Sequence, residues 1–391
     1  MPVTIGALRE RAPEETRVGI VPEIADKFAA VGARVLIERG AGALAQFPDA
    51  LFRKVEWVDS GVAVLEQSDV VLTVQPLGVE QIARLKPAAV VAGFMQAHAK
   101  HAEIRALRDR RITSFAMELV PRISRAQSMD ALSSQAAIAG YKAVLIAANH
   151  LAKFLPMLTT AAGTIRPAQV LVIGAGVAGL QAIATARRLG AVVEAYDVRA
   201  ATKEQVKSLG AKFVDTGVTA EGAGGYAREL TAEEKQTQQE VLDARIGAAD
   251  AVVTTASVPG RTAPRIISRS AVERMRPGSV IVDIAAESGG NCELTSAGEV
   301  VEHRGVKIVG PVNLPGQLAY NASEMYARNL YNFLKPALDK GELAIDWTDE
   351  VFAQSCVTHD GIIRHEATRK AIEGPSPASG TLSPPGGESE G

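Results

Sequence analysis

The stretch Val170-Leu-Val-Ile-Gly174-Ala-Gly176-Val-Ala-Gly179 decides the fold of this chain. It has the pattern of a short apolar strand, a glycine-rich turn and the start of a helix. In such a unit Gly174 permits the tight turn, Gly176 lets the backbone approach a pyrophosphate, and Gly179 lets the helix pack close to the strand. The helix N-terminus then directs unpaired N–H groups at the phosphates. The pattern therefore predicts a dinucleotide site.

The next strand supplies the acidic residue that such a site needs. The segment Ala191-Val-Val-Glu-Ala-Tyr-Asp197 is apolar and ends in a carboxylate, 18 residues after Gly179. A carboxylate at this place accepts hydrogen bonds from the ribose hydroxyls. It also repels a 2′-phosphate, so Asp197 favours NAD(H) over NADP(H). A tight turn without any ligand would explain the glycines, but it leaves the acid unexplained.

The composition is that of an ordinary globular protein. The chain has 391 residues, of which 47% are hydrophobic and 22% charged, and this length favours two domains. A net charge of −2 provides no basic field for nucleic acid or an anionic membrane surface. Cys292 and Cys356 lack metal-ligand spacing and fit a reducing cytosol. The first residues show no secretory leader and no apolar run reaches 18 residues, so we expect neither secretion nor a membrane span.

Strand and helix patterns alternate along the chain. They predict an α/β fold of two Rossmann-like, doubly wound parallel-sheet domains, the second inserted into the first. The predicted strands are 4–8, 35–38, 69–74, 89–94 and 112–116 in the first domain, and 170–173, 191–197, 212–214, 250–255, 279–285 and 306–309 in the second. The clearest predicted helices are 22–31, 101–110, 134–153 and a stretch over 315–338 that crosses back onto the first domain.

The domain boundaries follow from this pattern. We expect a discontinuous first domain of residues 1–134 and 315–370, a dinucleotide domain of residues 135–314, and a disordered tail of residues 371–391. The tail is rich in proline, glycine and serine, as disordered linkers are. No internal repeat at a solenoid period is visible in the sequence.

A long insertion follows the third predicted strand of the dinucleotide domain. Residues 215–240 contain several glycines, one aromatic residue, Tyr226, and then a charged stretch. A long flexible loop with one aromatic side chain, on the side where the cofactor lies in such folds, is typical of a lid that closes over bound nucleotide. A solvated insertion without a role is the alternative interpretation.

A polar segment at the predicted domain junction is a second candidate site. Residues 117–135 follow a predicted strand and precede a helix, and they include Arg122, Arg125, Gln127 and Asp130. Capping of the helix by Asp130 or Ser133 would explain one or two of these side chains. It does not explain the whole group, and polar side chains beside an inter-domain crevice are the expected means of holding a reactive ring.

These motifs together resemble the soluble NAD(H)-binding domain I, in the alpha subunit, of proton-translocating nicotinamide nucleotide transhydrogenase. The resemblance covers roughly residues 1–370 and is carried by residues 121–130, 174–186, 197–206, 224–227 and 287–292. The family implies that NADH binds to this chain and passes a hydride to NADP⁺ on a separate component. A membrane component, also separate, couples the exchange to proton movement.

The resemblance also implies roles for single residues. Arg122, Gln127, Asp130 and Ser133 would form the catalytic set, which orients the dihydronicotinamide and the incoming ring. Tyr226 would lie on the loop that closes over NADH. The other cofactor-binding residues would be Gly174, Gly176, Val177, Ala178 and Gly179 at the pyrophosphate, Asp197, Val198 and Arg199 at the adenosine ribose, and Tyr141 in the same pocket. Core packing is an equal alternative for Tyr141.

The implied partners follow from the same family. They are an NADP(H)-binding component, a membrane-spanning component and a second copy of this chain in a homodimer. We expect a cytoplasmic location, peripheral to the inner membrane through those partners, with no nucleic acid and no direct membrane insertion. No residue is expected to bind a metal, because the histidines, such as His98 and His101, lack a cysteine or carboxylate cluster that would complete a coordination set.

Alanine dehydrogenase, which shares this fold, is the alternative enzyme, and residues 9–22 resemble both families. Alanine dehydrogenases carry a substrate-binding lysine and a catalytic histidine at positions that fall on Gln75 and Gln96 here, in an approximate register with His98 nearby. Glutamine cannot act as a general base, whereas oxidation of an amino acid requires proton removal from its nitrogen. Hydride transfer between two nicotinamides requires only their positioning.

Two further alternatives belong to other functional classes. A regulatory NAD(H) sensor would bind the cofactor without turnover, and oxidation of bound NADH in the presence of a partner distinguishes it from an enzyme. A structural relative with a degraded site is at odds with the intact glycine turn and the intact loop over 122–130.

Overall fold

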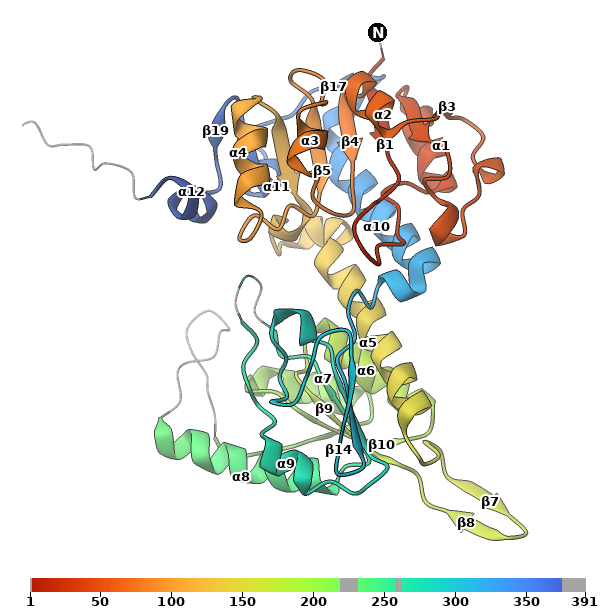
Figure 1. Ribbon diagram of the computed structural model, residues 1–391, viewed down its shortest axis with the longest axis vertical. Helices are drawn as coiled ribbons and strands as arrows, with labels where there is room; N and C mark the ends of the chain where they lie inside the picture. The colour runs from red at the N-terminus through yellow and green to blue at the C-terminus, as the bar shows by residue number, and fades with distance from the viewer. Residues whose placement is uncertain (1, 219–230, 258–259, 261, 375–391) are drawn as a thin grey trace, which may run out of the picture.

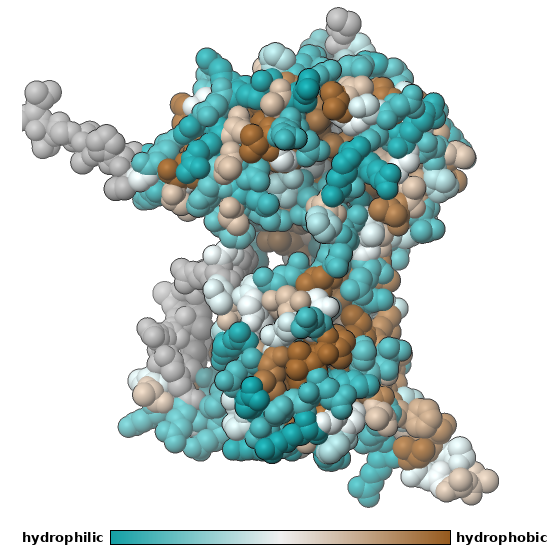
Figure 2. Space-filling view, viewed as in Figure 1, coloured by the Kyte–Doolittle hydropathy of each residue, from teal (hydrophilic) through white to brown (hydrophobic). Residues whose placement is uncertain are grey.

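The computed structural model describes residues 2–218, 231–257, 260 and 262–374. It has two lobes, each built on one β-sheet, and the long helix α5 (Ala131–His150) runs from one lobe to the other (Figure 1). The molecular surface is hollowed between the two lobes (Figure 2). The predicted α/β fold class is confirmed by this architecture.

The sheet of the first lobe has eight strands in the order β19-β18-β6-β5-β4-β1-β2-β3. The chain fills the sheet outward from β1 in both directions, so a topological switch point lies between β1 and β4. The strands are β1 (Thr4–Ala7), β2 (Arg34–Glu38), β3 (Glu56–Val58), β4 (Val70–Leu72), β5 (Val90–Gly93), β6 (Thr113–Ala116), β18 (Cys356–His359) and β19 (Ile362–Ile363). The accompanying helices are α1 (Pro22–Ala30), α2 (Gly61–Gln67), α3 (Val79–Ile82), α4 (His101–Asp109), α10 (Ala319–Leu334), α11 (Glu350–Ser355) and α12 (Glu366–Glu373).

The sheet of the second lobe has seven strands in the order β11-β10-β9-β12-β13-β15-β14. Its switch point lies between β9 and β12, where the glycine turn begins. The strands are β9 (Gln169–Ile173), β10 (Val192–Tyr196), β11 (Lys212–Phe213), β12 (Ala251–Thr254), β13 (Val280–Asp283), β14 (Val300–His303) and β15 (Val306–Val309). The helices are α6 (Val177–Arg188), α7 (Lys203–Ser208), α8 (Ala232–Ala248) and α9 (Arg269–Glu273).

Each sheet has buried apolar clusters on both of its faces. Strands such as β13 are therefore buried at every position and lack the alternation of a half-exposed strand. Helix α10 follows the second sheet in the chain but packs in the first lobe, where Tyr326, Leu330 and Phe333 are fully buried. This is the return to the first lobe that the sequence after residue 315 predicts.

Helix α5 connects the two cores. Among the described residues it is the one helix that by length and composition could cross a membrane, and 44% of its apolar window is buried inside the protein. It packs against α6 and α10. A Cβ added to Gly140 would lie 2.0 Å from the carbonyl oxygen of Ala178, so α5 and α6 touch at backbone distance there.

Several details differ from the sequence prediction. Both sheets end in antiparallel strands, β18 and β19 in the first and β14 in the second, where parallel sheets were expected. Two short hairpins were not predicted because their strands are only two or three residues long: β7 (Leu158–Thr160) with β8 (Gly163–Ile165), and β16 (Leu338–Asp339) with β17 (Glu342–Leu343). Helix α12 includes residues 371–373, which the sequence assigns to the tail.

The predicted domain division stays a prediction in its exact limits. The strands of the first sheet come from residues 4–116 and 356–363, and those of the second from residues 169–309. Residues 375–391 of the predicted tail lie outside the described part of the chain.

Candidate nucleotide-binding site

The turn after β9 has the geometry that its glycines require. Gly174 has a φ of +93°, a region that favours glycine. A Cβ on Gly179 would lie 1.8 Å from the carbonyl oxygen of Gly174, so the first turn of α6 packs directly on the turn backbone. A Cβ on Gly176 would have no described atom within 4 Å. Gly176 is also the N-cap of α6 and has no capping side chain, which leaves N–H groups of the first helical turn open to a ligand.

Asp197 follows β10 and directs its carboxylate at the glycine turn. Its Oδ2 accepts a hydrogen bond from the N–H of Ala175 at 2.7 Å, and its Oδ1 accepts one from the N–H of Arg199 at 2.8 Å. The Arg199 guanidinium donates to both oxygens, from Nε to Oδ1 and from Nη2 to Oδ2, each at 2.9 Å. The carboxylate thus joins the two loops that border the candidate site.

Asp197 is ionised at neutral pH although it is buried. Burial by itself would raise the pKa of the carboxyl group, but hydrogen bonds from the Arg199 side chain and from the backbone N–H groups of Arg199 and Ala175 outweigh it and lower that pKa. An ionised carboxylate only accepts hydrogen bonds, which is the state that ribose hydroxyls need.

Three apolar side chains that were expected to contact the cofactor are exposed: Tyr141 to 40%, Val177 to 43% and Val198 to 39%. Core packing, the alternative interpretation of Tyr141, is therefore wrong. Ala178 is partly buried, and its backbone faces Gly140 of α5. Tyr226 and residues 219–230 of the predicted lid lie outside the described part of the chain.

The polar loop that precedes α5 forms two short 3-10 helices, η3 (Met117–Leu119) and η4 (Ser124–Met129). Asp130 caps α5: its Oδ1 accepts a hydrogen bond from the N–H of Ser133 at 2.9 Å, and its Oδ2 accepts one from the Ser133 hydroxyl at 2.6 Å. The capping interpretation is confirmed for Asp130, and α5 begins at residue 131 instead of 134. The cap fixes both side chains relative to the start of the helix.

The other polar side chains of this loop diverge. Arg125 turns to the start of α11, where it contacts Asp349 at 2.6 Å and Glu350 at 3.6 Å, so it does not join the group in which the sequence placed it. Arg122 and Gln127 are exposed, and the described part of the structure shows no side-chain hydrogen bond for either. These two side chains are therefore available to a ligand or a partner.

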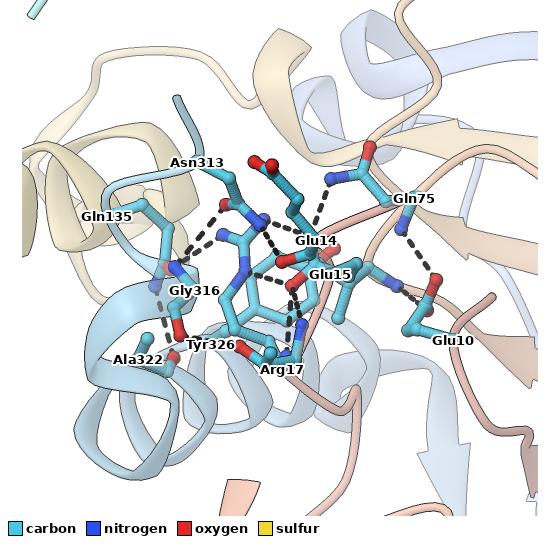
Figure 3. Close-up of polar contacts among 12 residues, drawn as sticks. Glu10, Glu14, Glu15, Arg17, Gln75, Gln135, Asn313, Gly316, Ala322 and Tyr326 are labelled. Atoms are coloured by element: carbon cyan, nitrogen blue, oxygen red, sulfur yellow. Dashed lines mark hydrogen bonds and ion pairs between the residues drawn. The ribbon is translucent and has the colours of Figure 1, made fainter. Parts of the chain in front are cut away.

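A buried polar network in the first lobe was missed by the sequence analysis (Figure 3). Arg17 pairs with Glu15 through two hydrogen bonds of 2.8 and 2.6 Å, and its Nη1 donates to the side-chain oxygen of Gln135 on α5 at 2.9 Å. Despite the burial of Glu15, its hydrogen bonds and ion pair with Arg17 lower its pKa. The resemblance of residues 9–22 to known families was the available signal, but spacing alone does not show which charges turn inward.

Gln75 and Gln96 belong to the same network. The Gln96 amide donates to the side-chain oxygen of Gln75 at 2.9 Å, and the Gln75 amide donates to Glu15 at 2.7 Å. The two positions that align with the alanine dehydrogenase lysine and histidine are thus direct neighbours. His98 faces the second lobe: a Cβ on Gly260 would lie 3.5 Å from the Cβ of His98.

Two more carboxyl groups flank this network. Burial raises the pKa of Glu10 to about 7, although the N–H groups of Val74 and Gln75 donate to it. Burial also raises the pKa of Glu118, which accepts hydrogen bonds from the backbone of residues 95 and 96. A cavity of about 210 Å³ adjoins Glu10 and Gln75, and a larger hollow of about 590 Å³ is also in the first lobe, not at the glycine turn. Since both carboxyls bind loop backbone, their evident role is to hold the loops that follow β4 and β5.

Asn291, in the resemblance segment over residues 287–292, holds the loop after β12 next to the glycine turn. Its side-chain amide donates to the carbonyl oxygens of Ala256 and Pro264 at 2.7 and 2.9 Å, and its oxygen accepts the N–H of Ala256 at 3.0 Å. The hydroxyl of Thr255 donates to the carbonyl of Gly174 at 3.1 Å. Among the described residues no group of three or more His, Cys, Asp or Glu side chains is placed to hold a metal ion.

Known proteins resemble this chain over almost its whole length. The family models "Alanine dehydrogenase/PNT, N-terminal domain" and "Alanine dehydrogenase/PNT, C-terminal domain" match residues 6–139 and 143–366. The first of the parts into which the NAD(P) transhydrogenase alpha subunit of Rhodospirillum rubrum is divided is 49% identical over 372 residues, which covers 92% of this chain and 97% of that protein. A transhydrogenase structure from Sinorhizobium meliloti has a TM-score of 0.84 at 43% identity and covers 92% of this chain and 99% of its own.

These similarities separate the two enzymes that the sequence left open. The alanine dehydrogenase of Mycobacterium tuberculosis is 28% identical over 387 residues, covering 96% of this chain and 99% of that protein. The identity with the Rhodospirillum subunit is much higher over a comparable length. The predicted family and enzyme class are thereby confirmed, and the chain belongs to the family of NAD(P) transhydrogenase alpha subunits.

Proposed function

We propose that this chain binds NAD(H) at the Gly174 turn and exchanges hydride with NADP(H) bound to a separate component. The observation that carries the proposal is the open backbone at Gly176, between the N-terminus of α6 and the ionised Asp197. N–H groups at a helix start suit a pyrophosphate, while the carboxylate suits ribose hydroxyls and opposes a 2′-phosphate. The relatives' names supply the reaction class.

The residues of this chain would position the nucleotide and exchange no proton with it. Bound NADH supplies the hydride, so the protein has to place two nicotinamide rings within reach of each other and exclude water. We assign the ring contacts to Arg122 and Gln127, and we assign Asp130 and Ser133 to fixing that loop at the start of α5. The further proposed cofactor contacts are Gly174, Gly179, Val177, Ala178, Asp197, Val198, Arg199, Tyr141 and Tyr226.

The Gln75–Gln96 pair supports hydride exchange over amino acid oxidation. Amino acid oxidation needs a group that takes a proton from the substrate nitrogen, and a neutral amide does not do so. Each amide is also occupied by a neighbouring side chain of the network. The carboxyls beside the pair are held by backbone N–H groups, which leaves them a structural role.

The proposal requires partner subunits. The relatives are named as an alpha subunit or as the first section of one, which implies that they work within a larger enzyme. We propose an NADP(H)-binding component, a membrane-spanning component that couples the exchange to proton translocation, and a homodimer of this chain. In this arrangement the chain lies on the cytoplasmic side of the inner membrane and is held there by its partners.

Turnover by the reconstituted enzyme tests the proposal. The assay follows NADPH-dependent reduction of an NAD⁺ analogue by this chain, with and without the NADP(H)-binding component. We expect turnover only with the partner. Binding of NADH without any partner-stimulated turnover would favour a sensor, and reduction of NAD⁺ with L-alanine by this chain alone would establish the alanine dehydrogenase alternative.

A further inference from the structure

Asp197 has no acceptor capacity to spare in the chain without nucleotide. A carboxylate offers about four lone-pair positions to donors. Four hydrogen bonds occupy them here: two from the backbone N–H groups of Ala175 and Arg199, and two from the Arg199 guanidinium. The Asp197 side chain is only 6% exposed, so a further donor can reach it only by replacing one of these four.

The two kinds of donor differ in how readily they leave. The backbone donors belong to the glycine turn and to the loop after β10, and they hold the carboxylate in place. The Arg199 side chain is 43% exposed, and its two bonds reach one oxygen each. A ribose diol also offers two donors, so it can take over the guanidinium positions and leave the backbone bonds intact.

We propose that Arg199 is a specificity-determining residue, which occupies the ribose position on Asp197 until the nucleotide displaces it. The inference rests on the proposed binding of NAD(H) at this turn. Arg199 then weakens NADH binding, because its two bonds must break before Asp197 accepts the ribose hydroxyls. Its effect on NADPH is opposite in sign, since a cation beside Asp197 offsets the charge that repels a 2′-phosphate.

Nucleotide titrations of the full chain test this role. The dissociation constants for NADH and NADPH are measured by fluorescence for the wild type, Arg199→Met, Arg199→Lys and a control, Arg245→Met. Arg245 is a matched control because its side chain is also 43% exposed and pairs, at 3.3 Å, with Glu194 on the same strand β10. Methionine is unbranched and cannot donate a hydrogen bond to a carboxylate.

We expect Arg199→Met to bind NADH about two- to fivefold more tightly, the scale that a half-exposed ion pair sets. Its preference for NADH over NADPH widens by at least the same factor, while Arg245→Met leaves both constants unchanged. Arg199→Lys retains the charge but loses the two-pronged contact, so its NADH affinity falls between those of the wild type and Arg199→Met.

Two results have different meanings. Unchanged or weaker NADH binding in Arg199→Met, next to measurable binding by the wild type, overturns the inference and makes Arg199 a direct contact or a bystander. A wild-type chain that binds neither nucleotide refutes the proposed function itself. Thermal unfolding of each variant without nucleotide checks that all four proteins are folded.

Discussion

Alanine substitutions at two glycines of one turn separate packing from ligand binding. In Gly179→Ala the new Cβ would lie 1.8 Å from the carbonyl oxygen of Gly174, whereas such contacts are essentially never shorter than 3.0 Å, so the backbones must separate by about 1.2 Å. Overpacking costs about 1–3 kcal/mol, and alanine recovers about 1 kcal/mol through helix propensity. Because the obstacle is backbone, we take the upper value and expect a net loss of about 2 kcal/mol.

Gly176→Ala has the opposite profile. The residue has φ −77° and ψ −167°, which alanine adopts freely, and its Cβ would meet no described atom within 4 Å. Stability should therefore stay within about 0.5 kcal/mol of the wild type. The methyl group occupies the space through which the pyrophosphate has to approach the backbone, so NADH affinity should fall by about 1–3 kcal/mol, a factor of about 5 to 150 in Kd.

The assay compares thermal unfolding without nucleotide and NADH titration for both variants and the wild type. A loss of about 2 kcal/mol lowers Tm by about 4–8 °C for a cooperative unit of this size. A Gly179→Ala protein as stable as the wild type would refute the close packing of α6 on the turn. Wild-type NADH affinity in Gly176→Ala would refute the pyrophosphate position.

Three further substitutions test separate parts of the argument. The folded pKa of Glu10, about 7, lies above its ordinary value of 4.5, so the wild type loses stability as pH rises through this range. Glu10→Gln removes that loss, and its Tm should gain on the wild type between about pH 5 and pH 8; a constant difference would contradict the raised pKa. Gln127→Asn should leave Tm and NADH affinity nearly unchanged and cut the hydride-transfer rate sharply, and an unchanged rate in stopped-flow measurements removes Gln127 from the mechanism. Asp197→Asn should weaken NADH binding and relax discrimination against NADPH, and equal selectivity before and after would sink the ribose assignment.

The elements near the glycine turn were predictable because they are continuous in sequence. Strand, turn, helix and second strand follow one another, and their spacing alone places Asp197 beside the turn. The antiparallel edge strand β18 was not predictable in this way. It is a short segment near residue 356 that pairs with β6, more than 200 residues earlier, and no local pattern specifies that partner.

The sequence by itself determined the fold class, the glycine turn with its acid, and the family, because each depends on local spacing or on long motifs. Only the tertiary structure decided which polar side chains meet. Arg17 and Gln135 are 118 residues apart, yet they share a hydrogen bond in the first lobe, while Arg125 turns to α11 and away from its neighbours in sequence. It also showed that Arg199 fills the remaining acceptor sites of Asp197. A buried polar group must find its partner wherever packing brings one, and packing joins segments that are distant in the chain.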